Sequence, residues 1–376
     1  MKFIVNSQVF SKKIRNLVGL TASGKSTSSI LNYFLLELSG KKLSVTASDT
    51  ETTVKVFLEL QEKGEDGKVA VPAKILKDLL DNLGDIPVGI SIDAENKIDI
   101  TAGKGKYAFV GESAELFPIM EFADNAKKYE IKTDIILQGI QKTIFATSDE
   151  ALRQIMMGVH FEFSEEGVNF IGTDAHKLVR LHRSDWKTSD ATNFTVHKKA
   201  LNLLKDILSD YANDEESQLE MQITDKNICF TLPDAIVYCR LVDGTFPAYR
   251  TILPKENNNV LIVETSLLKS SLKRMVNFAA KSTYQVYFKI QGQELSVIAE
   301  DVDYATKADD NIACEYDGEA MDISFNAKFV LEMLNVVESD KVKFALSIDK
   351  KPGLIFPMEQ NESEDLLMLV MPMAIA

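Results

Sequence analysis

The pattern of apolar and polar positions repeats three times along the chain. Ser7 to Leu20 has apolar residues at helical spacing, and Phe34 to Ala47 reads as a hairpin with turn residues in its middle. A second helix is predicted at Ala73 to Gly84, and short alternating runs over Ile90 to Ile100 close the unit. Helix, hairpin, helix and hairpins predict an α+β domain whose helices gather on one face of its sheets.

Two further units follow in the same order. Their predicted helices, hairpins and closing strands are Asp134 to Ser148, Gly158 to Gly172, Lys198 to Asp210 and Leu219 to Leu232, then Ser266 to Lys281, Gln285 to Ala299, Ala327 to Ser339 and Val342 to Phe356. The pattern therefore predicts three tandem copies of one fold.

A short repeated segment supports the three copies. SVTASDTETTVK, NFIGTDAHKLVR and SVIAEDVDYATK each place an aspartate after apolar and small residues, at Asp49, Asp174 and Asp301. These aspartates are 125 and 127 residues apart, about one domain each. We predict domains at 1–125, 126–254 and 255–376, with joins in the polar or proline-bearing stretches 121–132 and 253–260.

Charge separates the predicted helices from the rest of the chain. The net charge of -14 argues against a protein that holds nucleic acid by bulk attraction. The six helical windows nevertheless contain 14 Lys or Arg against 7 Asp or Glu, whereas the remaining residues carry 28 against 49. Lysine is an ordinary residue of solvated helices, so one such helix would mean little. The segregation over all six indicates a local basic surface.

Candidate chemistry is sparse. The three cysteines (Cys229, Cys239, Cys314) form no C-x-x-C pair and are expected to be buried free thiols. The four histidines (His160, His176, His182, His197) belong to no nucleophile or metal motif. We therefore predict a non-catalytic protein without metal or cofactor. No apolar run approaches 18 residues and no signal peptide is visible at the N-terminus, which favours a cytoplasmic protein.

One motif points elsewhere. Gly19 to Ser26, GLTASGKS, matches the phosphate-binding loop G-x-x-x-x-G-K-[ST], which would place Lys25 and Ser26 on phosphate and magnesium. That loop needs a strand before it and a helix after it, whereas here a predicted helix precedes it and a predicted strand, Ile30 to Leu38, follows. A P-loop NTPase is thus an alternative, and a flexible loop carrying Lys25 is favoured.

Three separated segments, GTDAHKLVRL at 172–181, LVDGTFPAYRTILP at 241–254 and VMPM at 370–373, resemble the bacterial sliding clamps, the β subunits of DNA polymerase III. The resemblance covers the whole chain. It implies a head-to-tail homodimer that forms a ring of six similar domains around duplex DNA, with helices lining the hole and sheets outside. Such a ring tethers the replicative polymerase and contacts DNA without sequence preference. A monomeric acidic interaction scaffold is a further alternative.

The resemblance also implies a pocket for short Gln- and Leu-containing peptides of the polymerase, the clamp loader and repair proteins. Carried over, it consists of Met156, Thr173, Ala175, His176, Lys177, Leu178, Pro247, Thr251, Ile252, Leu369, Val370, Met371, Pro372 and Met373. Methionine-rich walls suit a site that accepts several ligands. Family members commonly have Gly, Arg and a basic residue at Ala175, Lys177 and Ala374, so the apolar contacts carry over better than the polar ones.

Two further sets of residues follow from the basic helices and the resemblance. The expected DNA contacts are Lys12, Lys13, Arg15, Lys25, Arg153, Gln154, Lys198, Lys199, Lys273 and Arg274. For the joint between subunits, the resemblance pairs Tyr107 and Phe109, on the last strand of the first domain, with Phe278, at the first helix of the third.

Overall fold

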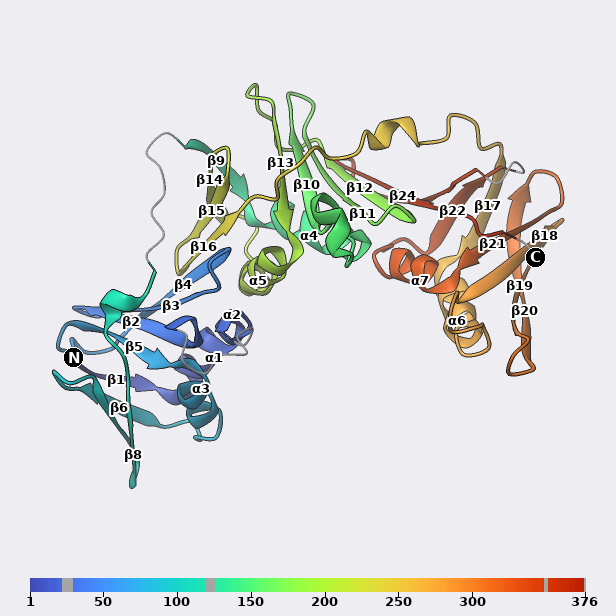
Figure 1. Ribbon diagram of the computed structural model, residues 1–376. Helices are drawn as coiled ribbons and strands as arrows, with labels where there is room; N and C mark the ends of the chain where they lie inside the picture. Colours follow the sequence, from blue (N-terminus) through green and yellow to red (C-terminus); the bar gives the residue numbers. More distant parts are fainter. Residues whose placement is uncertain (22–29, 119–125, 348–350, 375–376) are drawn as a thin grey trace. The chain divides into compact units, whose positions relative to one another are not determined.

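The structure is a computed structural model that describes residues 1–21, 30–118, 126–347 and 351–374 (Figure 1). The chain forms two compact units. One contains Met1–Ile136 and Lys199–Leu241, and the other contains Leu137–Lys198 and Val242–Ala376. The middle of the three copies is therefore divided between both units, because its sheets continue into each neighbouring copy.

The first copy begins with a strand that the hydrophobic pattern had not indicated. Its elements are β1 (Lys2–Asn6), α1 (Ser7–Ile14), η1 (Arg15–Leu17), α2 (Val18–Thr21), η2 (Ile30–Asn32), β2 (Tyr33–Ser39), β3 (Lys42–Ser48), β4 (Thr52–Glu59), β5 (Gly67–Pro72), α3 (Ala73–Asp81), β6 (Pro87–Ile92), β7 (Lys97–Ala102) and β8 (Gly105–Val110). Asn6 caps α1, since its side chain accepts hydrogen bonds from the amides of Gln8 and Val9.

The second copy repeats this order. Its elements are β9 (Lys127–Lys132), α4 (Thr133–Thr143), η4 (Ile144–Ala146), η5 (Ala151–Met156), β10 (Gly158–Phe163), β11 (Val168–Thr173), β12 (Lys177–Arg183), β13 (Thr192–His197), α5 (Lys198–Leu208), η6 (Ser209–Tyr211), β14 (Gln218–Ile223), β15 (Asn227–Leu232) and β16 (Ala235–Arg240). The stretch 121–132, predicted as a join, thus includes β9.

The third copy closes the chain. The connector before it carries η7 (Tyr249–Thr251). The elements of the third copy are β17 (Asn259–Glu264), α6 (Thr265–Met275), β18 (Gln285–Gln291), β19 (Glu294–Asp301), β20 (Thr306–Asp317), β21 (Met321–Asn326), α7 (Ala327–Asn335), β22 (Lys341–Leu346), β23 (Gly353–Pro357) and β24 (Glu364–Val370). The predicted helices and hairpins lie where the periodicity indicated, and the opening helices are shorter than predicted.

The repeated aspartates shape one tight turn in each copy. A side-chain oxygen of Asp49 accepts the amides of Glu51 and Thr52, and Asp174 accepts those of His176 and Lys177. Asp301 does the same for the two amides at 303 and 304. Aspartate favours such turns because its short side chain can bond to backbone amides two and three residues ahead. The repeat seen in the sequence is therefore a repeated hairpin turn.

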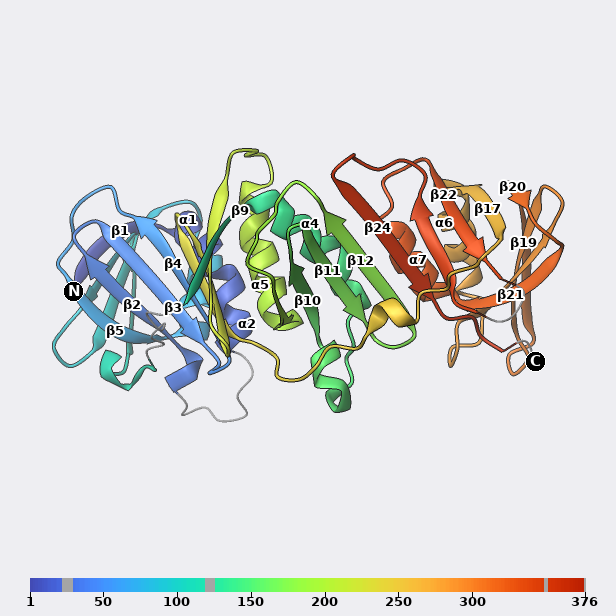
Figure 2. The ribbon, with the colours of Figure 1, turned by 90° about the horizontal axis from the view of Figure 1, so that it is seen from above.

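Each unit is built on a sheet that crosses from one copy to the next. In the first unit an eight-stranded sheet has the order β5-β2-β3-β4-β16-β15-β14-β9, with Val54 of β4 opposite Val237 of β16. In the second, a twelve-stranded sheet joins β12 to β24, which lie side by side in Figure 2, with Val179 opposite Met368. All four side chains are fully buried, so the core continues across both junctions.

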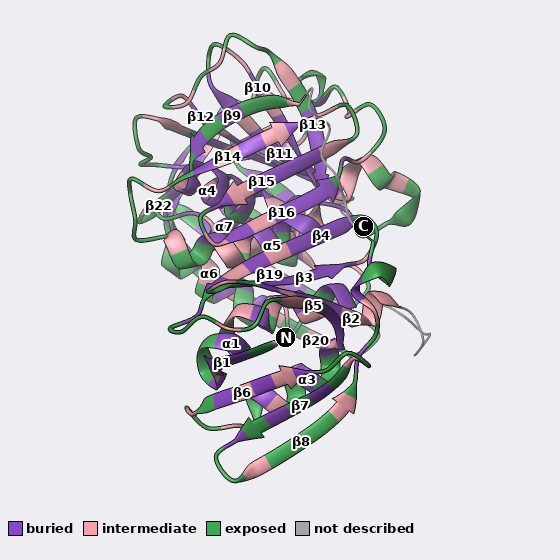
Figure 3. Cartoon of the chain, turned by 90° about the vertical axis from the view of Figure 1, so that its left-hand side faces the viewer, coloured by how far each residue is buried: buried purple, intermediate pink, exposed green. Residues whose placement is uncertain are grey.

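Two of the described strands with an open side carry or adjoin the residues expected at the subunit joint. β8 ends the four-stranded sheet β1-β6-β7-β8, and most of its residues are exposed, as Figure 3 shows. β20 pairs with β19 through residues 306–313 and with β17 only through residues 314–317. Among the described strands, none pairs with the first half of β20 on the β17 side.

Candidate functional site

The residues of the expected peptide pocket all lie in the second unit and come from four segments. The first segment is the turn between β11 and β12. The Thr173 hydroxyl donates to the Lys177 carbonyl at 2.8 Å and accepts the Ala175 amide at 3.2 Å, which fixes the turn. Ala175 has φ +75°, a left-handed conformation that favours glycine. Ala175 and His176 are exposed, so both can face a ligand.

The second segment is the end of β24 and the tail after it. Leu369 pairs with Leu178 and Val370 with Lys177, and the Met371 amide donates to the His176 carbonyl at 2.9 Å. Leu178, Leu369 and Val370 are buried and can only be a floor. The Met371 side chain is 40% exposed, so it can form a wall above that floor.

The third segment is the connector that leads into the third copy. Tyr249 is buried in a cluster with Leu178 and Leu369, which attaches the connector to the floor. Pro247 is half-buried, and Thr251 and Ile252 are exposed. The connector therefore adds an apolar side to the two strands.

The fourth segment is the η5 loop with Met156. The Ser148 amide donates to the Met156 carbonyl at 2.8 Å, closing the loop. A Cβ on Gly244 of the connector would lie 3.6 Å from the Cβ of Ile155, so loop and connector lie close together. Within the expected set, the larger apolar side chains that are exposed or half-buried are Met156, Pro247, Ile252, Met371, Pro372 and Met373.

Lys177 differs from the rest of the set because its ammonium is already engaged. The side chain is buried, pairs with Glu332 of α7 at 2.5 Å and lies 3.7 Å from Asp174. Its Nζ also lies 4.4 Å from the centre of the Phe329 ring. These contacts satisfy the buried charge and attach the turn to α7. Lys177 therefore supports the turn through its contacts with α7 and is not part of the exposed surface of the site.

Of the expected DNA contacts that the structure describes in the first unit, most are paired with carboxylates. Lys12 lies 3.2 Å from Asp210, and Lys13 pairs with Asp234, which also accepts from the Tyr211 hydroxyl. Burial opposes ionisation of Asp234, but the hydrogen bonds from Lys13 and Tyr211 hold its pKa below the usual value. In the same unit Arg15 is exposed, Lys199 pairs with Asp49, and Lys25 is outside the described residues.

The basic residues of the second unit show a similar arrangement. Lys198 donates to the Ser148 carbonyl at 2.7 Å and pairs with Asp149. The hydrogen bond from Lys198 lowers the pKa of Asp149. Of the other expected DNA contacts, Arg153 lies 3.4 Å from Glu150 and bonds the Asp174 carbonyl, Arg274 pairs with Asp310, and Gln154 and Lys273 are exposed. Phosphate would have to compete with carboxylates for most of these cations.

The residues expected at the subunit joint lie on the two open strands or beside them. Tyr107 of β8 is 39% exposed and Phe109 is half-buried. Phe278 follows α6, is 40% exposed, and its carbonyl accepts the Thr306 hydroxyl at the start of β20. The apolar side chains available for a joint are therefore next to unpaired backbone.

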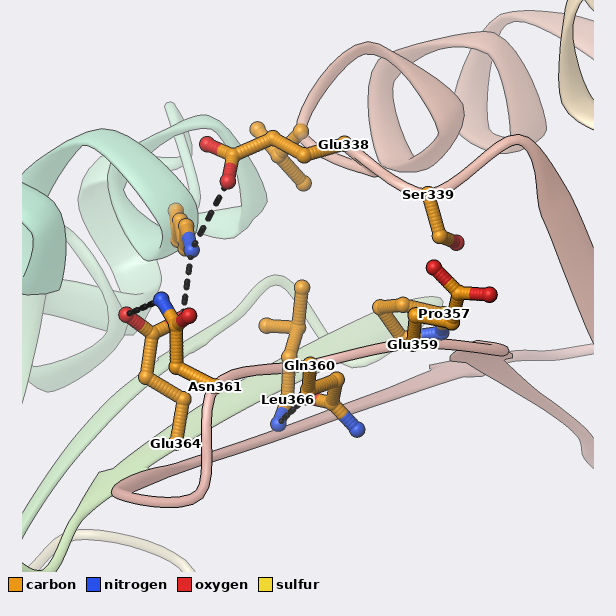
Figure 4. A pocket seen from close by; sticks show the side chains of 10 residues that line it. Glu338, Ser339, Pro357, Glu359, Gln360, Asn361, Glu364 and Leu366 are labelled. Atoms are coloured by element: carbon orange, nitrogen blue, oxygen red, sulfur yellow. Dashed lines mark hydrogen bonds and ion pairs between the residues drawn. The ribbon is translucent and has the colours of Figure 1, made fainter.

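A buried ionic network, not indicated by the sequence, joins the second and third copies. Lys142 of α4 bonds Glu364 at 2.8 Å and lies 3.8 Å from Glu338, on the edge of a polar cavity of about 330 Å³ (Figure 4). Burial opposes ionisation of Glu364, but the bond from Lys142 keeps its pKa low. Arg183 lies 3.7 Å from Glu364. Partners more than 180 residues apart leave no local sequence signal.

The cysteine prediction is confirmed, since Cys229, Cys239 and Cys314 are all buried and free. Burial raises the pKa of each thiol, most strongly for Cys239. In the described part of the chain, no His, Cys, Asp or Glu group has the arrangement of a metal site, and no helix is long and apolar enough to cross a membrane.

Three family models match the chain in succession. They are the N-terminal, central and C-terminal domains of the DNA polymerase III beta subunit, and they match residues 1–121, 130–248 and 250–374. The chain belongs to the DNA polymerase III beta subunit family. The predicted fold class, three tandem clamp domains of α+β type, is confirmed.

Full-length relatives agree with this family. The beta sliding clamp of Pseudomonas putida is 24% identical over 377 residues and covers all of both chains. That of Halalkalibacterium halodurans is 23% identical, covering 96% of this chain and 97% of its own. The same fold is seen in the Pseudomonas aeruginosa clamp bound to griselimycin (TM-score 0.92, 23% identity) and in the Bacillus subtilis clamp (0.90, 21%), each with full coverage of both chains.

Family membership also decides between the two alternatives of a P-loop NTPase and a non-catalytic protein. Beta sliding clamps are non-catalytic, so the prediction of a protein without enzymatic activity is confirmed. The loop motif agrees, because its first residues, Gly19 to Thr21, are helical in α2 (Val18–Thr21), and the strand β2 (Tyr33–Ser39) follows the motif after the short η2. This is the reverse of the strand and helix that a phosphate-binding loop requires.

Proposed function

We propose that two chains form a head-to-tail ring that encircles duplex DNA and tethers the replicative polymerase and other partners. The ring gives processivity because an encircled duplex cannot leave without opening a joint, even where each contact is weak. The proposed domains remain 1–125, 126–254 and 255–376.

The observation that carries the ring is the identical register of the two junctions within the chain. When the copies are aligned on the turns at the repeated aspartates and on their strand pairings, Val54 and Val179 are equivalent positions, and so are Val237 and Met368. Both junctions therefore use one geometry, in which the last strand of a copy pairs with the post-turn strand of the preceding copy. Repeating one heterologous contact closes a ring when the rotation permits it.

The same rule predicts the contact between chains. β8 is the equivalent of β16 and β24, and the first half of β20 is the equivalent of β4 and β12. Transferring the register places Tyr107 opposite Ala308 and Lys106 opposite Asp309 of the second chain. A large side chain would face a small one, and opposite charges would meet across the strands. Phe278, next to β20, would cover the apolar side of this joint.

In this proposal each contact between the protein and DNA is weak. Lys12, Lys13, Lys198, Lys199 and Arg274 each have a carboxylate partner. A phosphate gains less from a cation that must first leave its partner, so the protein can slide along the duplex. Arg15, Gln154 and Lys273 complete the proposed set, together with Arg153 and Lys25.

The four segments around Leu178 and Leu369 are the proposed binding site for partner peptides. A buried leucine or phenylalanine contributes roughly 1.5 to 3 kcal/mol, so two anchors on the floor would contribute about 3 to 6 kcal/mol toward the roughly 8 kcal/mol of a micromolar affinity, before ordering costs. The proposed partners are the polymerase, the loader and repair proteins that carry short Gln- and Leu-containing segments.

Light scattering after size exclusion tests the ring. The protein should elute at about twice the 41.9 kDa mass of the chain, whereas the alternative acidic scaffold would be monomeric. Phe278→Asp should favour monomers, because an unpaired carboxylate would be buried at the joint. Ile75→Asp is the control, since Ile75 is exposed to a similar extent on α3. A Phe278→Asp protein that stays dimeric at nanomolar concentration would remove Phe278 from the joint.

Fluorescence anisotropy with a Gln-x-x-Leu-x-Phe peptide tests the pocket. Deleting residues 371–376 should abolish binding while leaving the dimer intact, because the deletion removes the methionine wall and leaves β24 in place. Unchanged affinity in the truncated protein would mean that partners bind elsewhere.

A further inference from the structure

The tail after β24 is held at a second point, by residues that the family resemblance did not supply. Met373 forms an isolated antiparallel bridge with Ser324 of β21, through a 2.8 Å bond from its amide to the Ser324 carbonyl. Ser324 is fully buried, and its hydroxyl donates to the Met373 carbonyl at 3.0 Å. Met373 therefore pairs with the edge of β21 as a single residue of an added strand would.

Gln285 extends this contact. The Gln285 Nε2, at the start of β18, donates to the Ala374 carbonyl at 2.8 Å and to the Ser324 hydroxyl at 2.9 Å. An amide nitrogen carries two protons and a hydroxyl carries one, so the three side-chain bonds can form together in one direction, from Gln285 through Ser324 to the tail. Such a relay is satisfied only while the tail is in place.

The two attachments fix both methionines of the proposed pocket wall. At one end the Met371 amide bonds to the His176 carbonyl of the central copy, and at the other Met373 bonds to Ser324 of the third copy. Pro372 between them has no amide proton and a fixed φ, so it limits the paths that the backbone can take. A chain end without such attachments would fray.

We infer that Gln285 and Ser324 are positioning residues of the peptide site, which hold Met373, at the far end of the methionine wall, in place before a peptide arrives. This inference rests on the proposed function of the pocket. A wall that is ordered in advance spares the ligand the entropy cost of ordering it, and this raises affinity without a new contact. Neither side chain needs to touch the peptide.

The variants Gln285→Glu and Ser324→Ala test this directly. Glutamate keeps the shape of Gln285 and removes both donated hydrogen bonds, and alanine breaks the relay. Each should weaken peptide binding by about three- to tenfold, the range expected for one hydrogen bond. The double variant should lose no more than the stronger single variant, because both act through one attachment. Gln291→Ala, an exposed glutamine at the other end of β18, is the control.

Hydrogen exchange at the Met373 amide separates positioning from general damage. In both variants it should accelerate while the Met371 amide, β21 and β18 stay protected, and the dimer should persist. The inference is overturned if peptide affinity is unchanged, whether or not the Met373 amide becomes labile. It is also overturned if affinity falls while that amide stays protected. Failure of the unmodified protein to bind the peptide would instead reject the proposed pocket.

Discussion

The His160 imidazole stacks on the Phe246 ring, with centroids 4.2 Å apart and planes 4° from parallel. The Nδ1 of His160 lies 2.9 Å from the Thr195 hydroxyl, and the ring is buried. The stack attaches the connector between the second and third copies to β10, on the strand that also carries Glu162, the partner of Arg250.

This stack predicts a pH dependence of stability. Burial lowers the pKa of His160 to about 4, against about 6.5 in an unfolded chain. The neutral ring therefore contributes stability that is present above pH 6.5 and lost as the pH falls toward 4, roughly 3 kcal/mol in all. Urea unfolding from pH 7 to pH 4 should show this loss, and His160→Gln should reduce it. If the free energy of unfolding of His160→Gln fell between pH 7 and pH 4 as much as that of the unmodified protein, the assignment to His160 would be contradicted. His176→Gln, at an exposed histidine, is the control.

The left-handed Ala175 predicts a stabilising substitution. A glycine tolerates φ +75° without a Cβ clash, so Ala175→Gly should raise the free energy of unfolding by about 0.5 to 1 kcal/mol. Thr50→Gly, at φ +77° in the equivalent turn, should behave alike. Ala248→Gly is the control, because Ala248 has φ -70°. Urea unfolding midpoints measure the change in stability. A destabilised Ala175→Gly protein would mean that the Ala175 methyl group stabilises the fold by more than the strain of its left-handed backbone destabilises it.

The buried pair Lys142 and Glu364 predicts an asymmetry between single and double substitutions. Glu364→Gln should destabilise the protein by about 3 kcal/mol, because it leaves the Lys142 ammonium buried without its main counter-charge. The double variant Lys142→Met, Glu364→Leu should recover much of this loss. Glu315→Gln, in an exposed pair with Lys341, should change stability little. Equal losses in the single and double variants would show that the network acts through packing.

The transferred register predicts a charge-reversal cycle at the joint. Lys106→Asp or Asp309→Lys should each raise the dimer dissociation constant about fivefold, since like charges would then face each other across the strands. Combining both should restore the dimer, and Lys68→Asp, at an exposed position of β5, should have no effect. Analytical ultracentrifugation measures all four proteins. Additive losses in the double variant would mean that the register is wrong.

The sequence predicted what short-range pattern encodes. Apolar periodicity located both helices of each copy, because it depends on neighbours within a few residues. The repeated aspartates revealed the three copies, and the structure shows that each forms a turn. Strands after the turns, such as β4, β12 and β20, were not predicted as elements, and the strands that open the copies, β1, β9 and β17, were missed as well. The opening strands are five or six residues long, and β9 reads KKYEIK, a charged edge strand without a clear apolar face.

The site was less predictable than the fold because its support is long-range. The resemblance supplied Leu178 and Leu369, and the structure pairs them across the junction. Nothing near Lys177 in the sequence indicates Glu332, which is 155 residues away. Gln285 and Ser324 likewise contact the tail only after three strands have paired. Polar residues that position a site from another copy follow no periodic sequence pattern, so only the structure reveals them.

Retention on circular DNA tests the central claim most directly. The protein should be loaded onto a nicked circular duplex with a clamp loader, separated from free protein by gel filtration, and the DNA then cut once with a restriction enzyme. A ring that encircles the duplex should stay on the circle and be lost after linearisation, because sliding off an end requires no broken contact. Equal retention on circular and linear DNA, or retention lost from both at moderate salt, would show that the protein binds the surface of DNA and would contradict the account.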